Sequence, residues 1–85
     1  MHEELKTAQN RVVGLKQLLR ELATDNVTCI YIALNVDDQL KAKIAEAVDG
    51  REIPVVEIDS MDELGQVCEI DVGAACAAIL KNKSS

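Results

Sequence analysis

Three polar side chains near the start of the sequence are spaced so that they could bind nucleic acid. If residues 14–23 form a helix, Lys16, Gln17 and Arg20 fall within about 100° of arc on its surface. Such side chains donate hydrogen bonds to phosphate oxygens and to base edges. Gly14 leaves the helix start without a side chain, so its unpaired amides could approach an anion. A solvated helix face explains the same residues, and on their own they favour that simpler interpretation.

A second candidate site is the segment from Glu69 to Gly73, which shows no helical period and is predicted to be a loop. Ile70 and Val72 alternate there with acidic residues. Apolar side chains on a loop either fill a gap in the core or contact a partner molecule. Taken alone, the segment favours the first of these roles.

Catalysis and metal binding have no comparable support in the sequence. A nucleophilic triad needs a base beside the nucleophile, and His2 is the only histidine. Cys29, Cys68 and Cys76 are scattered and lack the spacing of metal ligands, so we expect reduced thiols that pack as small apolar groups. We therefore expect no enzyme activity, no metal or other cofactor, and no small-molecule substrate.

Alternating helices and strands are expected to position the two candidate segments. Five apolar residues between positions 15 and 23 recur at i, i+3, i+4, i+7 and i+8, which predicts a helix with one face turned to a core. Residues 27–34 are apolar or β-branched on both alternating sets. This pattern is typical of a strand that helices cover on both faces.

The rest of the chain continues this alternation. The remaining expected elements are a short helix over 2–10, an extended piece at 11–13, a helix from a cap at Asn35 or Asp37 to about Gly50, a second central strand at 53–58, and a helix after a capping box at Ser60. Residues 74–80 stay open, because their alanines favour a helix while a short apolar run also suits a buried strand. The order of elements predicts βαβ units in a three-layer α/β/α domain.

Composition and charge limit how nucleic acid could be bound. The 85 residues suffice for one domain, and their net charge is −6. Four of the nine basic residues lie in the first twenty positions, whereas residues 52–80 hold seven acids and no base. Any nucleic-acid binding must therefore use a local patch. We find no signal peptide pattern or membrane-spanning run in the sequence and expect a cytoplasmic protein.

Three segments of the sequence resemble one known family. They are Val12-Val13-Gly14-Leu15-Lys16-Gln17, Ile32-Ala33-Leu34-Asn35-Val36-Asp37 and, most specifically, Leu64-Gly65-Gln66-Val67-Cys68-Glu69-Ile70-Asp71-Val72-Gly73-Ala74-Ala75. In order and spacing they are similar to the kink-turn-binding ribosomal protein family of archaeal and eukaryotic large subunits, and especially to its short YbxF- and YlxQ-like bacterial members. The resemblance covers nearly the whole chain.

The resemblance implies one α/β domain over residues 1–85, a three-layer α/β/α sandwich with a small mixed four-stranded sheet in which residues 74–80 form a strand. It also implies that the helix start after Gly14 reads sheared G·A pairs of kink-turn RNA, while the loop at 69–72 covers an unstacked nucleotide. The implied RNA-binding residues are Gly14, Lys16, Gln17, Arg20, Glu69, Ile70, Asp71 and Val72. RNA is then the expected partner, in a ribosomal or ribosome-associated role.

Acidic residues near the loop oppose that role. Family RNA binders commonly carry lysine where Gln66 stands and glycine where Glu69 stands. An acid about 8 Å from a phosphate costs about 0.5 kcal/mol in water, so we expect the acidic loop to weaken RNA binding. The alternative is an acidic protein-protein interaction module on the same scaffold that has lost RNA binding, with a protein partner or a second copy of the chain as its ligand.

Overall fold

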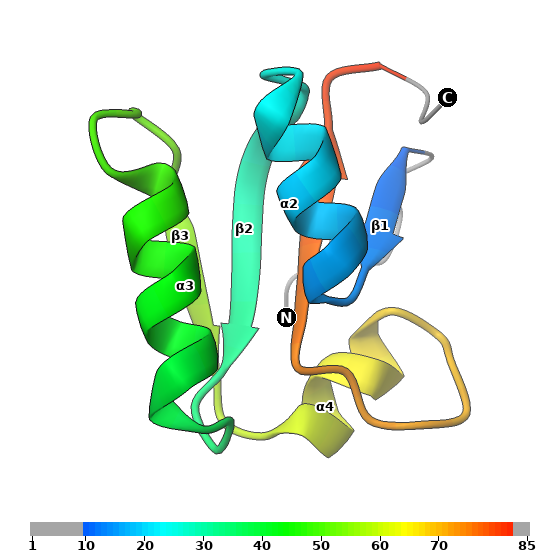
Figure 1. Cartoon of the computed structure of the whole chain (residues 1–85). Helices are drawn as coiled ribbons and strands as arrows, with labels where there is room; N and C mark the ends of the chain where they lie inside the picture. Colours follow the sequence, from blue (N-terminus) through cyan, green and yellow to red (C-terminus); the bar gives the residue numbers. More distant parts are fainter. Residues whose placement is uncertain (1–9, 83–85) are drawn as a thin grey trace.

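A mixed four-stranded sheet forms the centre of the protein in the computed structural model, which describes residues 10–82. Figure 1 shows how the helices and strands are arranged. The described elements are β1 (Arg11–Val13), α2 (Leu15–Ala23), β2 (Val27–Ala33), α3 (Asp38–Val48), β3 (Val55–Ile58), α4 (Met61–Val67) and β4 (Cys76–Leu80). The helix expected over residues 2–10 lies outside the described residues, apart from its last position.

The strand order is β1-β4-β2-β3, with β2 and β3 parallel and β4 antiparallel to both of its neighbours. The open question of residues 74–80 is therefore settled in favour of a strand, which covers residues 76–80 and occupies a central position. Ala77 and Ala78 are fully buried there, because small side chains let other elements pack closely on both faces. The prediction that residues 53–58 form a central strand was wrong. The described strand β3 pairs only with β2, and its Val55 and Glu57 are exposed.

The helices cover the sheet as its burial pattern requires. In Figure 1, α2 and α3 lie side by side across one face, and α4 packs near the end of the sheet where β4 begins. The consecutive residues 30–33 of β2 are all buried, which means that both faces of this strand are covered. The predicted α/β class with a small mixed four-stranded sheet is thus confirmed. None of the helices within residues 10–82 is long and apolar enough to cross a membrane.

Side chains cap the N-terminal ends of two helices. Asp37 caps α3, because its carboxylate accepts a hydrogen bond from the Leu40 amide at 2.9 Å. Ser60 caps α4 in the same way by accepting from the Glu63 amide at 3.2 Å. The other cap candidate, Asn35, instead accepts from the Met61 amide at 2.8 Å and so connects the β2–α3 turn to α4.

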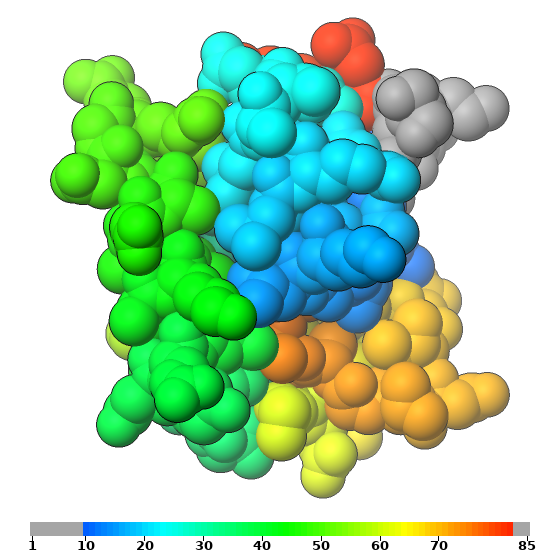
Figure 2. All heavy atoms as spheres, in the orientation of Figure 1, coloured from blue at the N-terminus to red at the C-terminus, as the bar shows by residue number. Residues whose placement is uncertain are grey.

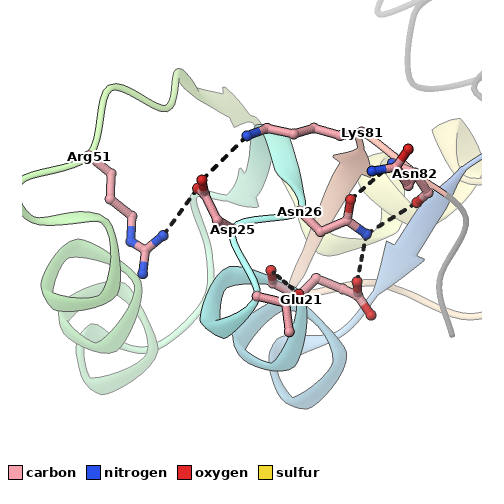
Figure 3. Close-up of polar contacts among 7 residues, drawn as sticks. Glu21, Asp25, Asn26, Arg51, Lys81 and Asn82 are labelled. Atoms are coloured by element: carbon pink, nitrogen blue, oxygen red, sulfur yellow. Dashed lines mark hydrogen bonds and ion pairs between the residues drawn. The ribbon is translucent and has the colours of Figure 1, made fainter.

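A cluster of polar side chains joins three chain segments at the end of α2, and Figure 3 shows these contacts. The Asn26 amide group donates to Glu21 Oε1 at 2.9 Å and to the Asn82 carbonyl at 3.2 Å, while its oxygen accepts from the Asn82 amide at 2.9 Å. Arg51 and Lys81 both form ion pairs with Asp25 nearby. Glu21 is only 4% exposed, so the hydrogen bond from Asn26 partly replaces the water that this carboxylate has lost.

We predict that Asn26→Ala lowers the free energy of unfolding by about 1 to 3 kcal/mol, since it removes three hydrogen bonds and leaves a buried carboxylate less well solvated. Urea titration followed by circular dichroism measures this loss. Asn82→Ala is the matched control, because Asn82 enters these contacts through its main chain and should change stability by less than about 0.5 kcal/mol. Equal losses in the two variants would contradict the assignment.

Candidate nucleic-acid interface

The start of α2 presents main-chain amides without a side-chain cap. Gly14 is the N-cap residue, with φ of 99°, and no side chain of the helix start bonds to its free amides. A residue with a side chain rarely adopts this dihedral angle, although nothing lies within 4 Å of where a Cβ would stand. Backbone conformation is therefore what requires glycine here. The Gly14 amide itself donates to the Cys76 carbonyl at 2.8 Å, which fixes the helix start against β4.

The predicted polar face lies on the outside of α2. Lys16, Gln17 and Arg20 are all exposed, and within residues 10–82 the side chains of Lys16 and Gln17 form no hydrogen bond or ion pair. Arg20 Nη2 lies 3.6 Å from Glu21 Oε2, and 55% of the Arg20 side chain is exposed. The exposed guanidinium of Arg20 can reach a phosphate, and a full separation from the buried Glu21 carboxylate would cost free energy.

The loop after α4 is joined to that helix by main-chain hydrogen bonds. The Glu69 amide donates to the Gln66 carbonyl, the Ile70 amide to the Gly65 carbonyl, and the Ala74 amide to the Met61 carbonyl, each at 3.0 Å. Glu69 adopts a positive φ of 61°, which turns the chain out of the helix. Main-chain hydrogen bonds thus join both ends of the loop to α4.

The two apolar side chains of this loop have different environments. Ile70 is half-buried and packs against the core, whereas Val72 is 71% exposed. Ile70 thus fills a gap in the core, whereas a contact of Val72 with a partner stays a prediction. Val72 is the apolar group that a partner can reach.

A close contact between Gly65 and the loop was not evident from the sequence. A Cβ on Gly65 would overlap the Val72 carbonyl oxygen, and it would stand 3.1 Å from the Gly73 Cα. The loop thus lies directly across the helix at this position, which only glycine permits. Sequence periodicity does not reveal this contact, because Gly65 and Val72 belong to different elements.

The start of α2 and the loop lie at the same end of the protein. Figure 2 shows the surface of the first turn of α2, in blue, next to the surface of the loop, in gold to orange. A further bond that the sequence did not predict connects them, since Arg11 Nη2 donates to the Cys68 carbonyl at 2.6 Å. The structure therefore brings together the two segments that the sequence singled out 50 residues apart.

The negative charge at this end comes from the loop and from α4. Glu69 and Asp71 are exposed on the loop, and the Asp62 carboxylate lies beside Gly73. Glu57 is elsewhere, because it lies on β3 at the far edge of the sheet and lines a groove with α3. Of the seven acids between residues 52 and 80, Glu57 thus lies away from the candidate site.

A groove lies between α3 and β3. It has a volume of about 370 Å³ and is lined mainly by apolar side chains, with Lys41 and Glu57 at its sides. The groove therefore offers an apolar surface and few polar groups.

Within residues 10–82 no three histidine, cysteine or acidic side chains are grouped so that they could hold a metal ion.

Comparison with known proteins places this geometry in a family. The family model described as "Ribosomal protein L7Ae/L30e/S12e/Gadd45 family" matches residues 1–85. The chain belongs to this family. RNA-binding protein TTE2299 of Caldanaerobacter subterraneus is 47% identical over 68 residues, which cover 80% of this chain and 83% of that protein. RNA-binding protein YbxF of Geobacillus stearothermophilus is 36% identical over 80 residues, covering 94% and 98%.

A solved structure supports the same fold. The Giardia lamblia 15.5 kD RNA-binding protein superposes with a TM-score of 0.81 at 22% identity, over 94% of this chain and 68% of that one. The predicted resemblance to the family, including its short bacterial members, is thus confirmed. The individual binding residues remain predictions.

Two cysteines of this family member lie beside the candidate interface and are buried. Burial raises the pKa of the Cys76 thiol to about 11, against the smaller opposing effect of a hydrogen bond with the Gly14 main chain. Burial also raises the pKa of the Cys68 thiol, and the nearby charge of Arg11 partly opposes this. Both thiols are therefore protonated at neutral pH, as expected for thiols that pack as apolar groups.

We predict that iodoacetamide at about pH 8 modifies Cys29 of the folded protein well before Cys68 or Cys76, because Cys29 is half-buried and the other two are fully buried and protonated. Intact-mass spectrometry over time should show one added group, and three after unfolding in urea. Modification of Cys68 as fast as Cys29 would contradict this assignment.

We predict that Gly65→Ala destabilises the protein by about 1 to 2 kcal/mol, although alanine ordinarily favours a helix, because the added methyl group displaces the loop. Urea titration measures the loss, and faster hydrogen exchange at the Ile70 amide locates it. Gln66→Ala, at the next and exposed position of α4, is the control and should not be destabilised. A stabilised Gly65→Ala would show that the loop is not packed across the helix.

Proposed function

We propose that this protein binds RNA of the kink-turn type through the start of α2 and the loop at residues 69–72. The observation that carries the proposal is that exposed hydrogen-bond donors on α2 and the exposed apolar Val72 lie at one end of the protein. Similar proteins are named RNA-binding proteins, which supports the same partner. In this proposal the protein acts in the cytoplasm. It binds ribosomal or ribosome-associated RNA and catalyses no reaction.

Each part of the surface has a distinct task in this proposal. Lys16 and Gln17 donate hydrogen bonds to guanine edges in the widened groove, and Arg20 contacts a phosphate. Gly14 keeps the helix start open, so that main-chain amides reach the RNA as well. The Val72 side chain covers the face of an unstacked base, as apolar groups do in single-stranded recognition.

The charges make this binding weak but not unfavourable. If Glu69 and Asp71 each lie about 8 Å from a phosphate, together they cost about 1 kcal/mol in water before screening by salt. A well-placed donor pair to a base edge contributes about 1 to 3 kcal/mol. The donors of α2 therefore outweigh the two nearest loop acids, and the hydrogen bonds that join the loop to α4 lower the entropic cost of binding.

A second candidate function is a protein-interaction module that has lost RNA binding. The apolar groove between α3 and β3, whose lining includes Leu34 and Val55, each 41% exposed, favours this alternative. A partner that co-purifies in stoichiometric amount and resists ribonuclease would support the second function. Release of every partner by ribonuclease would count against it.

We predict that Lys16→Ala weakens binding to a standard kink-turn RNA by about ten- to a hundredfold, because it removes donors to a base edge. Calorimetric titration from about 50 to 200 mM salt measures the affinity. A plain duplex of the same composition is the RNA control, and it should bind much more weakly than the kink-turn.

Asp71→Asn is the protein control for this experiment, since it removes one acid of the loop and should tighten binding, most clearly at low salt. If the unaltered protein bound the kink-turn no better than the duplex, and Lys16→Ala changed nothing, RNA recognition by this surface would be disproved.

A further inference from the structure

The guanidinium group of Arg11 connects the two halves of the candidate interface. Its Nη2 atom donates to the Cys68 carbonyl at 2.6 Å in a partly buried bond between residues 57 positions apart. Arg11 begins β1, which leads through Gly14 directly into α2. Cys68 is the C-cap residue of α4 and immediately precedes the loop. The bond therefore links the strand that positions α2 to the point where the loop begins.

The loop is also fixed where it ends. The Gly14 amide donates to the Cys76 carbonyl at 2.8 Å, and Cys76 is the first residue of β4 after the loop. Bonds at both ends of the loop thus lead to the same short segment, residues 11–14. The internal hydrogen bonds of the loop join it to α4, and the Arg11 bond holds the C-terminal end of α4 to β1, so loss of the Arg11 bond should loosen these bonds as well.

The chemistry of the bond suits a fixed geometry. The last carbonyls of a helix lack partners within it and carry partial negative charge, so a guanidinium group is a favourable donor to Cys68. A charged donor makes the hydrogen bond stronger than a neutral one, and partial burial limits competition from water. The charge of Arg11 also acts on the Cys68 thiol, opposing the rise in its pKa that burial causes, which agrees with this close approach.

We infer that Arg11 is a positioning residue, which fixes the recognition loop relative to the start of α2 and does not itself contact RNA. The expected effect of Arg11 on RNA binding rests on the proposed function. One RNA can contact both Val72 and the donors of Lys16 and Gln17 only if the loop and the start of α2 lie at the right distance from each other. The effect of Arg11 on the loop itself does not depend on RNA.

Arg11→Met tests the inference, because methionine keeps an apolar stem and removes the charge and the donor. In the free protein we expect hydrogen exchange at the Ile70 and Ala74 amides to become about five- to tenfold faster, while exchange at Leu18 stays unchanged and reports an intact fold. In the complex we expect about five- to tenfold weaker kink-turn binding. The slope of log affinity against log salt should stay the same, because no phosphate contact is lost.

Arg20→Met is the matched comparison, since Arg20 is the proposed phosphate ligand and its loss should reduce the salt slope by about 0.7 to 0.9. Unchanged exchange of the loop amides in Arg11→Met would overturn the inference, and so would a salt slope reduced as in Arg20→Met. If the unaltered protein failed to prefer the kink-turn, the proposed function would fall, whereas the exchange data would still decide whether Arg11 positions the loop.

Discussion

The antiparallel pairing of β1 with β4 is the constraint on which the candidate interface depends. Val13 pairs with Ala77, so Gly14, which follows β1, lies beside Cys76, the first residue of β4. The hydrogen bond from Gly14 to the Cys76 carbonyl continues this pairing by one position. Because α2 begins where β1 ends and the loop ends where β4 begins, the same pairing brings both segments to one end of the sheet. Their proximity follows from strand pairing and needs no separate explanation.

The two ends of the protein differ in what their polar groups do. At the far end of α2, the side chains around Asn26 bond to one another and join three chain segments. At the near end, Lys16 and Gln17 point outward, and within residues 10–82 their side chains form no hydrogen bond or ion pair. Polar groups that satisfy one another stabilise a fold, whereas exposed donors beside the loop are available to a ligand. The division suits a small domain, whose core alone supplies little stability.

Small residues are what allow this arrangement to be so closely packed. Ala77 and Ala78 admit neighbours on both faces of the central strand β4, and Gly65 admits the loop across α4. Tyr31 is the single aromatic residue of the chain and is fully buried. Val72 is exposed on this loop, whose main chain packs against Gly65.

The sequence by itself determined the elements whose signals are local. The leucine period predicted α2, the two-sided apolar pattern predicted β2, and the residue types at 16, 17 and 20 predicted an exposed polar face. The motif around residues 64–75 also indicated the family, which the family match confirms. These features depend on neighbours three or four positions apart, or on an ordered string of residues, so they can be recognised without a structure.

Only the tertiary structure decided how distant segments meet. Residues 76–80 form a central strand because β1 and β2 both pair with them, although their alanines equally suit a helix. Residues 55–58 lie at an edge for the complementary reason, since among the described strands only β2 is their partner. The bond of Arg11 with the Cys68 carbonyl and the contact of Gly65 with Val72 also leave no local pattern. Hydrogen bonds and packing between segments far apart in the chain depend on the folded arrangement, and no periodicity within either segment encodes them.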